Sequence, residues 1–146
     1  MKSLKLLVAA LMVFALCGCK KAADKTTDKA AEVKTDAPFT VVQKMFEASG
    51  NADFDAVSKY VTDEFFKKSF AEHKNAYKTL SAEEKEAFKA EVAAEFKKLK
   101  MSLVKETIEG DTATLIVAAE GEKEHGKFVL KKVDGVWKIA SMGNGD

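Results

Sequence analysis

The sequence predicts an α+β domain in which a run of helices precedes an antiparallel sheet. Apolar residues recur at helical spacing from residue 38 to about residue 100, and the period then shortens towards two up to residue 142. Gly-Asp and Asp-Gly pairs separate neighbouring strand candidates, as expected for tight hairpin turns. This order is typical of helices packed on one face of a curled antiparallel sheet of about four strands.

The helical region begins at Pro38, which suits the first turn of a helix. Asp53 is a predicted cap for the second helix, and Ser81 with Glu84 has the spacing of a capping box. The polar stretch 72–78 is either helical or irregular. The apolar faces of the predicted helices carry Val42, Met45 and Phe46, then Phe54, Val57, Tyr60 and Val61, then Phe65, Phe66 and Phe70, and finally Phe88, Val92, Phe96 and Leu99.

The strand region alternates apolar and polar residues, most clearly in its second strand. There Ala113, Leu115 and Val117 share one face. Ile116 and Ala118 leave the other face only partly polar. The predicted strands span residues 102–109, 112–120, 126–133 and 136–142, with turns at Gly110-Asp111 and Asp134-Gly135.

Length and composition limit the class of protein. The chain has 146 residues, enough for one ordinary domain and a short extra segment, and its 47% hydrophobic content can fill a core. All basic residues are lysine, and the net charge is +1. Because a nucleic-acid-binding domain needs a strong basic patch and favours arginine, no nucleic-acid partner is expected.

The first nineteen residues have the pattern of a secretory signal. Lys2 and Lys5 supply positive charge, and the apolar run to Leu16 is too short to span a bilayer. It ends in Leu16-Cys17-Gly18-Cys19, which resembles the lipobox of bacterial lipoproteins. The resemblance implies cleavage between Gly18 and Cys19 and lipidation of the Cys19 thiol. The alternatives are a plain secretory signal cleaved elsewhere or a packed apolar helix with a chance cysteine.

This pattern divides the chain into a signal peptide over 1–18, an acylated Cys19 with a flexible tether over 19–37, and a domain over 38–146. The tether contains no aromatic residue and one apolar β-branched residue, Val33, so it cannot bury enough area to fold alone. It reaches at most roughly 60 Å. Lys20 after the lipidated cysteine implies, in a Gram-negative source, an outer-membrane protein facing the periplasm.

The domain resembles small periplasmic lipoproteins of the nuclear-transport-factor-2-like superfamily. The resembling segments are the opening helix 38–46, the break 50–54 and the closing strand with its turn, 134–139. The resemblance covers residues 38 to 142 and implies a cone-shaped, cystatin-like fold, related to lumazine-binding domains and shared with ketosteroid isomerase. It also implies that the indole of Trp137 packs under the helices. This fold hosts enzymes, binders and assembly subunits alike.

No residue pattern in the chain indicates a nucleophile elbow, a phosphate-binding loop or a metal site, so we expect no catalytic residue, metal or cofactor. The histidines, His73 and His125, lie in polar stretches and are expected to be exposed. Most aromatic residues are expected in an ordinary core. The candidate pocket residues are Tyr60, Tyr77, Glu106 and Trp137; Glu106 is included because it shares strand parity with Val104 and Ile108.

The function expected from these observations is a membrane-anchored, non-enzymatic envelope lipoprotein. Its partners are the membrane, through Cys19, and either a small apolar or amphipathic ligand or an envelope protein. Two alternatives stay open: an isomerase-like enzyme with Glu106 or Asp63 as base and a tyrosine donor, or a structural or immunity-type surface protein. A homodimer through the open sheet face would require an apolar outer face around Ile116 and Ala118.

Overall fold

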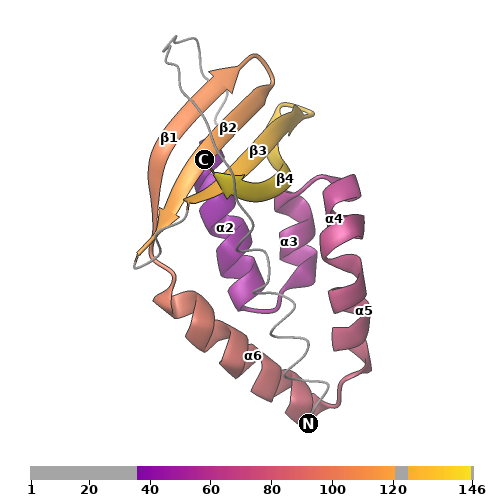
Figure 1. Cartoon of the computed structure of the whole chain (residues 1–146). Coiled ribbons are helices and arrows are strands. Elements are labelled where there is room, and N and C mark those ends of the chain that lie inside the picture. The colour runs from indigo at the N-terminus through magenta and orange to yellow at the C-terminus, as the bar shows by residue number, and fades with distance from the viewer. Residues whose placement is uncertain (1–35, 121–124, 146) are drawn as a thin grey trace.

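The computed structural model describes residues 36–120 and 125–145. The predictions for residues 1–18, Gly18, Cys19 and most of the tether lie outside this part of the chain. The fold is α+β, as predicted, with the helices before the sheet (Figure 1). The helices are α2 Pro38–Gly50, α3 Phe54–Tyr60, α4 Asp63–Ser69, α5 Ala71–Thr79 and α6 Ala82–Lys98, and the strands are β1 Met101–Glu109, β2 Thr112–Ala119, β3 His125–Val133 and β4 Val136–Gly145.

The predicted helix caps at Asp53 and Ser81 are confirmed by side-chain hydrogen bonds. The Asp53 carboxylate accepts a hydrogen bond from the Ala56 N–H at 2.9 Å. At α6, the Ser81 hydroxyl accepts from the Glu84 N–H at 3.3 Å while the Glu84 carboxylate accepts from the Ser81 N–H at 2.8 Å. These bonds satisfy N–H groups that have no partner inside the helix.

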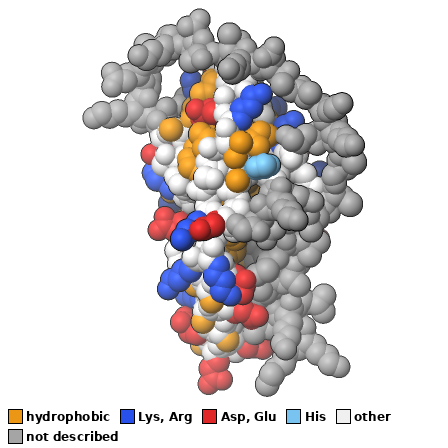
Figure 2. All heavy atoms as spheres, turned by 60° about the vertical axis from the view of Figure 1, so that its left-hand side comes forward, with side chains coloured by type: hydrophobic (Ala, Val, Ile, Leu, Met, Phe, Trp, Pro, Cys, Tyr) orange, Lys and Arg blue, Asp and Glu red, His pale blue; other side chains and the backbone are white. Residues whose placement is uncertain are grey.

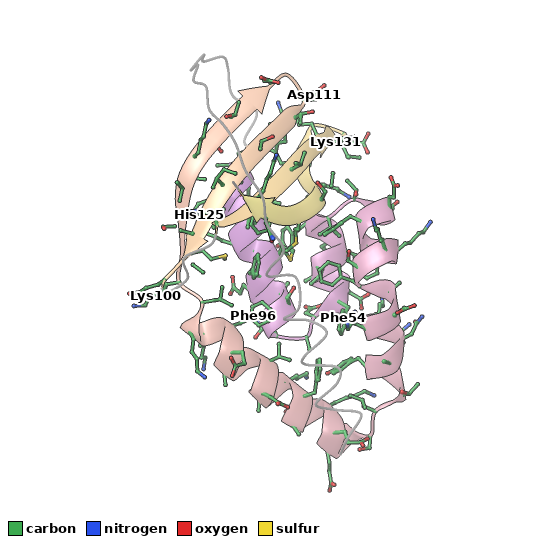
Figure 3. The ribbon with its side chains drawn as sticks, in the orientation of Figure 1. Phe54, Phe96, Lys100, Asp111, His125 and Lys131 are labelled. Carbon is green, nitrogen blue, oxygen red and sulfur yellow. The ribbon has the colours of Figure 1, made fainter. Side chains whose placement is uncertain are left out.

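The four strands form an antiparallel meander in the order β1-β2-β3-β4. Gly110, Asp134 and Gly135 adopt positive φ angles of 58°, 52° and 78°, which the two tight turns require. Both turns lie at the same end of the sheet, where Figure 3 shows Asp111 and Lys131. Lys100 and His125 lie at the opposite end.

The helices cover one face of the sheet, called here the inner face. Leu115 on β2, Leu130 on β3 and Ile139 on β4 are fully buried there, packed with Val42 and Met45 of α2. Burying one such side chain stabilises the fold by about 1.5–3 kcal/mol. Trp137 is also buried in this cluster, which contains α2 residues, as the resemblance implied.

A second cluster holds α6 against the other helices. Phe88 and Val92 of α6 are buried with Phe54 of α3, and Phe96 is half-buried beside them (Figure 3). The approach of α6 to α2 depends on Gly50, because a Cβ at that position would lie 2.9 Å from the Cβ of Phe96. The absence of a side chain at residue 50 therefore permits this close helix contact.

Two sequence-based details differ clearly from the structure. Leu99 was expected on the apolar face of the last helix, but α6 ends at Lys98 and Leu99 is exposed. The last strand continues past residue 142 to Gly145, because β3 starts at His125 and offers pairing partners that far. The stretch 72–78, expected to be either helical or irregular, is helical, within α5. Among the described residues, none of the helices is long and apolar enough to cross a membrane.

Candidate binding surface

The inner face of the sheet is buried on β2 but open on β1 from Leu103 onward, while Met101 at the start of β1 packs against the core. The strand register pairs Ile108 with Ala113 and Leu103 with Val117, and opposed residues in an antiparallel pair share a face. Ala113 and Val117 are 0% and 3% exposed, whereas Leu103 and Ile108 are 39% and 49% exposed. The inner face therefore changes from buried to exposed between the hydrogen-bonded strands β2 and β1.

The cause is the position of the helices. α2 packs against β2 and β4, and α3 and α4 pack against β4. In Figure 1, β1 forms the side of the sheet farthest from α3 and α4. Because β1 is also the first strand in the sheet order, its second edge has no strand neighbour among the described residues.

A bulge in β1 changes which residues face inward. The register shifts between Leu103 and Lys105, which makes Val104 the extra residue. The sequence parity had grouped Val104 with Glu106 and Ile108. Instead Leu103 shares the inner face with Glu106 and Ile108, and Val104 is 54% exposed at the bulge. Period-two counting fails here because a bulge adds one residue to one strand only.

We call this surface the β1 strip: Leu103, Val104, Glu106 and Ile108. It combines three exposed apolar side chains with one exposed carboxylate, Glu106, which opposes Leu115 in the register. An uncovered apolar surface beside an open strand edge is typical of a binding site, because both can be covered by a partner. The strip is suited to an apolar or amphipathic molecule, with the Glu106 carboxylate available to a cation or a hydrogen-bond donor.

The predicted pocket residues lie in different parts of the fold. Tyr60 packs against the main core, whereas Tyr77 belongs to the second cluster, with its ring centroid 5.6 Å from Phe54 and 5.4 Å from Phe88. Trp137 is buried on β4, with the Lys132 Nζ 4.9 Å from its ring centroid. β2 and β3 separate β4 from β1, which carries Glu106. The described structure does not bring the four residues into one site.

The carboxylates proposed as bases are open to water. Glu106 is exposed, and Asp63 is exposed in the first turn of α4. The hydrogen bond from Lys74 lowers the pKa of the Asp55 carboxyl, and hydrogen bonds with Ser81 lower the pKa of the Glu84 carboxyl. Both shifts favour the charged form, whereas a poised base at neutral pH needs a raised carboxyl pKa.

The histidines are half-buried, not exposed as the sequence suggested. The His73 ring Nδ1 lies 3.1 Å from the Ser69 carbonyl oxygen, one turn earlier along the chain, and His125 begins β3. Helical spacing explains the contact at His73, since residues four apart are neighbours. Within residues 36–120 and 125–145, no group of three or more His, Cys, Asp or Glu side chains has the arrangement of a metal site.

The outer face of the sheet is lysine-rich, a feature that the sequence reading missed. Ile116 and Ala118 lie there half-exposed, as expected for a partly apolar face. The register also places on this face four lysines, called here the lysine face: Lys105, Lys127, Lys131 and Lys138. The sequence did carry a signal for this face, because Lys127 and Lys131 have the opposite strand parity to the apolar residues Phe128 and Leu130.

In Figure 2, hydrophobic side chains gather over the sheet, while lysines and carboxylates lie side by side over the helical part.

No protein-family model matches this chain, and no curated protein matches it.

Proposed function

We propose that this chain is a lipid-anchored envelope protein whose α+β domain binds, without catalysis, an apolar or amphipathic ligand or a partner protein at the β1 strip. The observation that carries the proposal is the contrast in burial between β1 and β2. Leu103 and Ile108 are apolar and lie on the inner face of the sheet, as core residues do, but they remain 39% and 49% exposed.

The β1 strip is costly for a soluble protein to leave open. An apolar edge strand invites unwanted pairing, and proteins usually protect such edges with charges, bulges or coverage. β1 carries Lys105, Glu106 and the bulge at Val104, yet three apolar side chains stay exposed around them. A retained apolar surface of this kind supports a binding role.

A non-catalytic role is supported by the carboxylates of the strip and the helix starts. Glu106 and Asp63, the residues considered as bases, are both exposed to water, whereas a general base acts inside a pocket that excludes water. Glu106 instead serves as a polar contact for the bound molecule. The proposal therefore assigns Glu106 to recognition.

The lipid anchor is inferred from the lipobox-like sequence Leu16-Cys17-Gly18-Cys19. It is tested by metabolic labelling of cells with a radioactive fatty acid. We expect label on the wild-type chain and none on Cys19→Ser, which should accumulate as the precursor. The control is Cys17→Ser, which should be labelled normally. Equal labelling of wild type and Cys19→Ser would exclude this anchor.

The binding site is tested by photo-crosslinking in intact cells. A photoreactive amino acid replaces Ile108 on the β1 strip or, as a control, Val136, which is similarly exposed at 46% but lies on the outer face. We expect a discrete crosslinked product from residue 108 and none of the same mass from residue 136.

Native mass spectrometry of the domain released gently from the envelope distinguishes the two kinds of partner. A small-mass adduct that is lost in Leu103→Ser/Ile108→Ser and kept in Val133→Ser/Val136→Ser indicates a small ligand. A bare domain together with a protein crosslink indicates a partner protein, and a crosslink to the same chain indicates a homodimer. The proposal would be contradicted if the domain carried no adduct and residue 108 gave no crosslinked product.

A further inference from the structure

The lysines of the sheet's outer face share one surface that extends over β1, β3 and β4. Over the helices some lysines pair with a carboxylate, as Lys74 does with Asp55 at 2.6 Å, whereas others, such as Lys67 and Lys68, make no ion pair with a described residue. The four residues of the lysine face make no ion pair within the described part of the chain. This face therefore keeps its positive charge available.

The register concentrates that charge. Lys131 and Lys138 are directly opposite each other on β3 and β4, where like charges destabilise a sheet. Lys127 lies on the same face of β3, and Lys105 lies across β2 from it, with Ile116 between them. An anion on this face would relieve the repulsion between Lys131 and Lys138.

Acidic residues are few on the lysine face itself. Glu109 opposes Thr112 at the edge of the face, and Asp111 and Asp134 lie in the adjoining turns. Between the lysines the face carries hydroxyl and apolar groups, which can approach phosphate oxygens without repulsion. The other residues of the outer face that lie among these four lysines are Thr107, Thr112, Thr114, Ile116, Val129 and Ser141.

The same face ends in an exposed apolar pair. Val133 and Val136 oppose each other beside the β3–β4 turn and are 38% and 46% exposed. The next pair on this face is Lys131 and Lys138. Apolar side chains beside lysines suit the boundary between lipid headgroups and acyl chains, where both kinds of residue bind favourably.

We propose that the lysine face and the Val133–Val136 pair dock on the anionic phospholipid headgroups of the membrane that carries the chain. The inference rests on the proposed anchor, because a tether over residues 19–37 reaches at most roughly 60 Å and keeps the domain close to that surface. Docking in this way turns the inner face of the sheet, with the β1 strip, away from the bilayer. The lysine face thus orients the binding surface toward its partner.

Docking is tested with the chain from residue 20 onward, which lacks the apolar leader and retains the core, since the buried core residues lie between Val41 and Ile139. Its binding to vesicles of phosphatidylcholine, with and without phosphatidylglycerol, is measured by cosedimentation. We expect binding only to the anionic vesicles, with loss at high salt.

Lys131→Gln/Lys138→Gln should weaken vesicle binding by roughly 30-fold, because each lysine near an anionic surface contributes about 1 kcal/mol, a factor of about five. The matched control Lys67→Gln/Lys68→Gln removes the same charge from exposed positions on α4 and should change binding less than twofold. Val133→Ser/Val136→Ser, which keeps the charge, should weaken binding several-fold.

Three results would overturn the docking proposal: no binding to anionic vesicles, equal binding to neutral vesicles, or equal loss in the two lysine double variants. Vesicle binding by this chain needs no acylation, so its outcome is separate from the fatty-acid labelling of Cys19. Labelling without vesicle binding would support the lipid anchor and exclude docking through the lysine face. Vesicle binding without labelling would support docking and exclude the lipid anchor.

Discussion

β1 and β2 are hydrogen-bonded neighbours with similar apolar alternation, yet they have opposite environments. On the inner face, Leu115 of β2 is fully buried under α2, while Leu103 and Ile108 of β1 are exposed. The difference lies in the coverage by the helices, which reaches β2 and β4. Stability therefore resides on the covered strands, and the uncovered strand is available for binding.

Truncation of matched leucines gives the largest expected contrast. Leu115→Ala should lower the free energy of unfolding by about 2–5 kcal/mol, since it leaves a cavity in the core. Leu103→Ala should lower it by less than about 1 kcal/mol, because that side chain is 39% exposed. Urea unfolding of the chain from residue 20 onward measures both. Equal losses would show that β1 is covered in solution.

The helical cover itself can be tested at Gly50. Gly50→Ala places a Cβ 2.9 Å from the Phe96 Cβ, so α6 must shift from α2. We expect a loss of about 1–3 kcal/mol, as is usual for overpacking. Gly143→Ala is the control, because a Cβ there meets nothing within 4 Å. A stable Gly50→Ala protein would indicate that α6 is loosely held.

A smaller effect is expected from the start of α6. Ser81→Ala removes the acceptor for the Glu84 N–H and should destabilise the protein by about 1 kcal/mol. Because Ser81 begins the helix far along the chain from the β1 strip, crosslinking at residue 108 should be unchanged. Thermal unfolding and the crosslinking yield give the two readouts. Lost crosslinking would link α6 to the strip.

The smallest effect concerns acid pH. Hydrogen bonds with Ser81 lower the pKa of the Glu84 carboxyl below its ordinary 4.5. A carboxyl with a lowered folded-state pKa adds stability above the unfolded-state pKa, and loses it as pH falls through the folded-state value. Glu84→Gln should therefore be slightly less stable at neutral pH, and its difference from wild type should vanish in acid. A difference that persists below the folded-state pKa would contradict this account.

Local signals carried most of the fold prediction. Asp53 and the pair Ser81 and Glu84 cap helices because a side-chain oxygen can reach an N–H within three residues, whatever the rest of the fold does. The Asp134-Gly135 turn is equally local. The candidate pocket was harder to predict, since Tyr60 and Tyr77 both lie on helices but belong to different clusters.

The sequence by itself determined the α+β class, the helix starts, the hairpin turns and the apolar face of β2, because each depends on residues close together in the chain. Only the tertiary structure decided that α2 covers β2 but leaves β1 open. It alone placed the bulge at Val104 and gathered the lysine face from three strands. Those outcomes depend on strand register and helix position, which arise from contacts between residues distant in sequence.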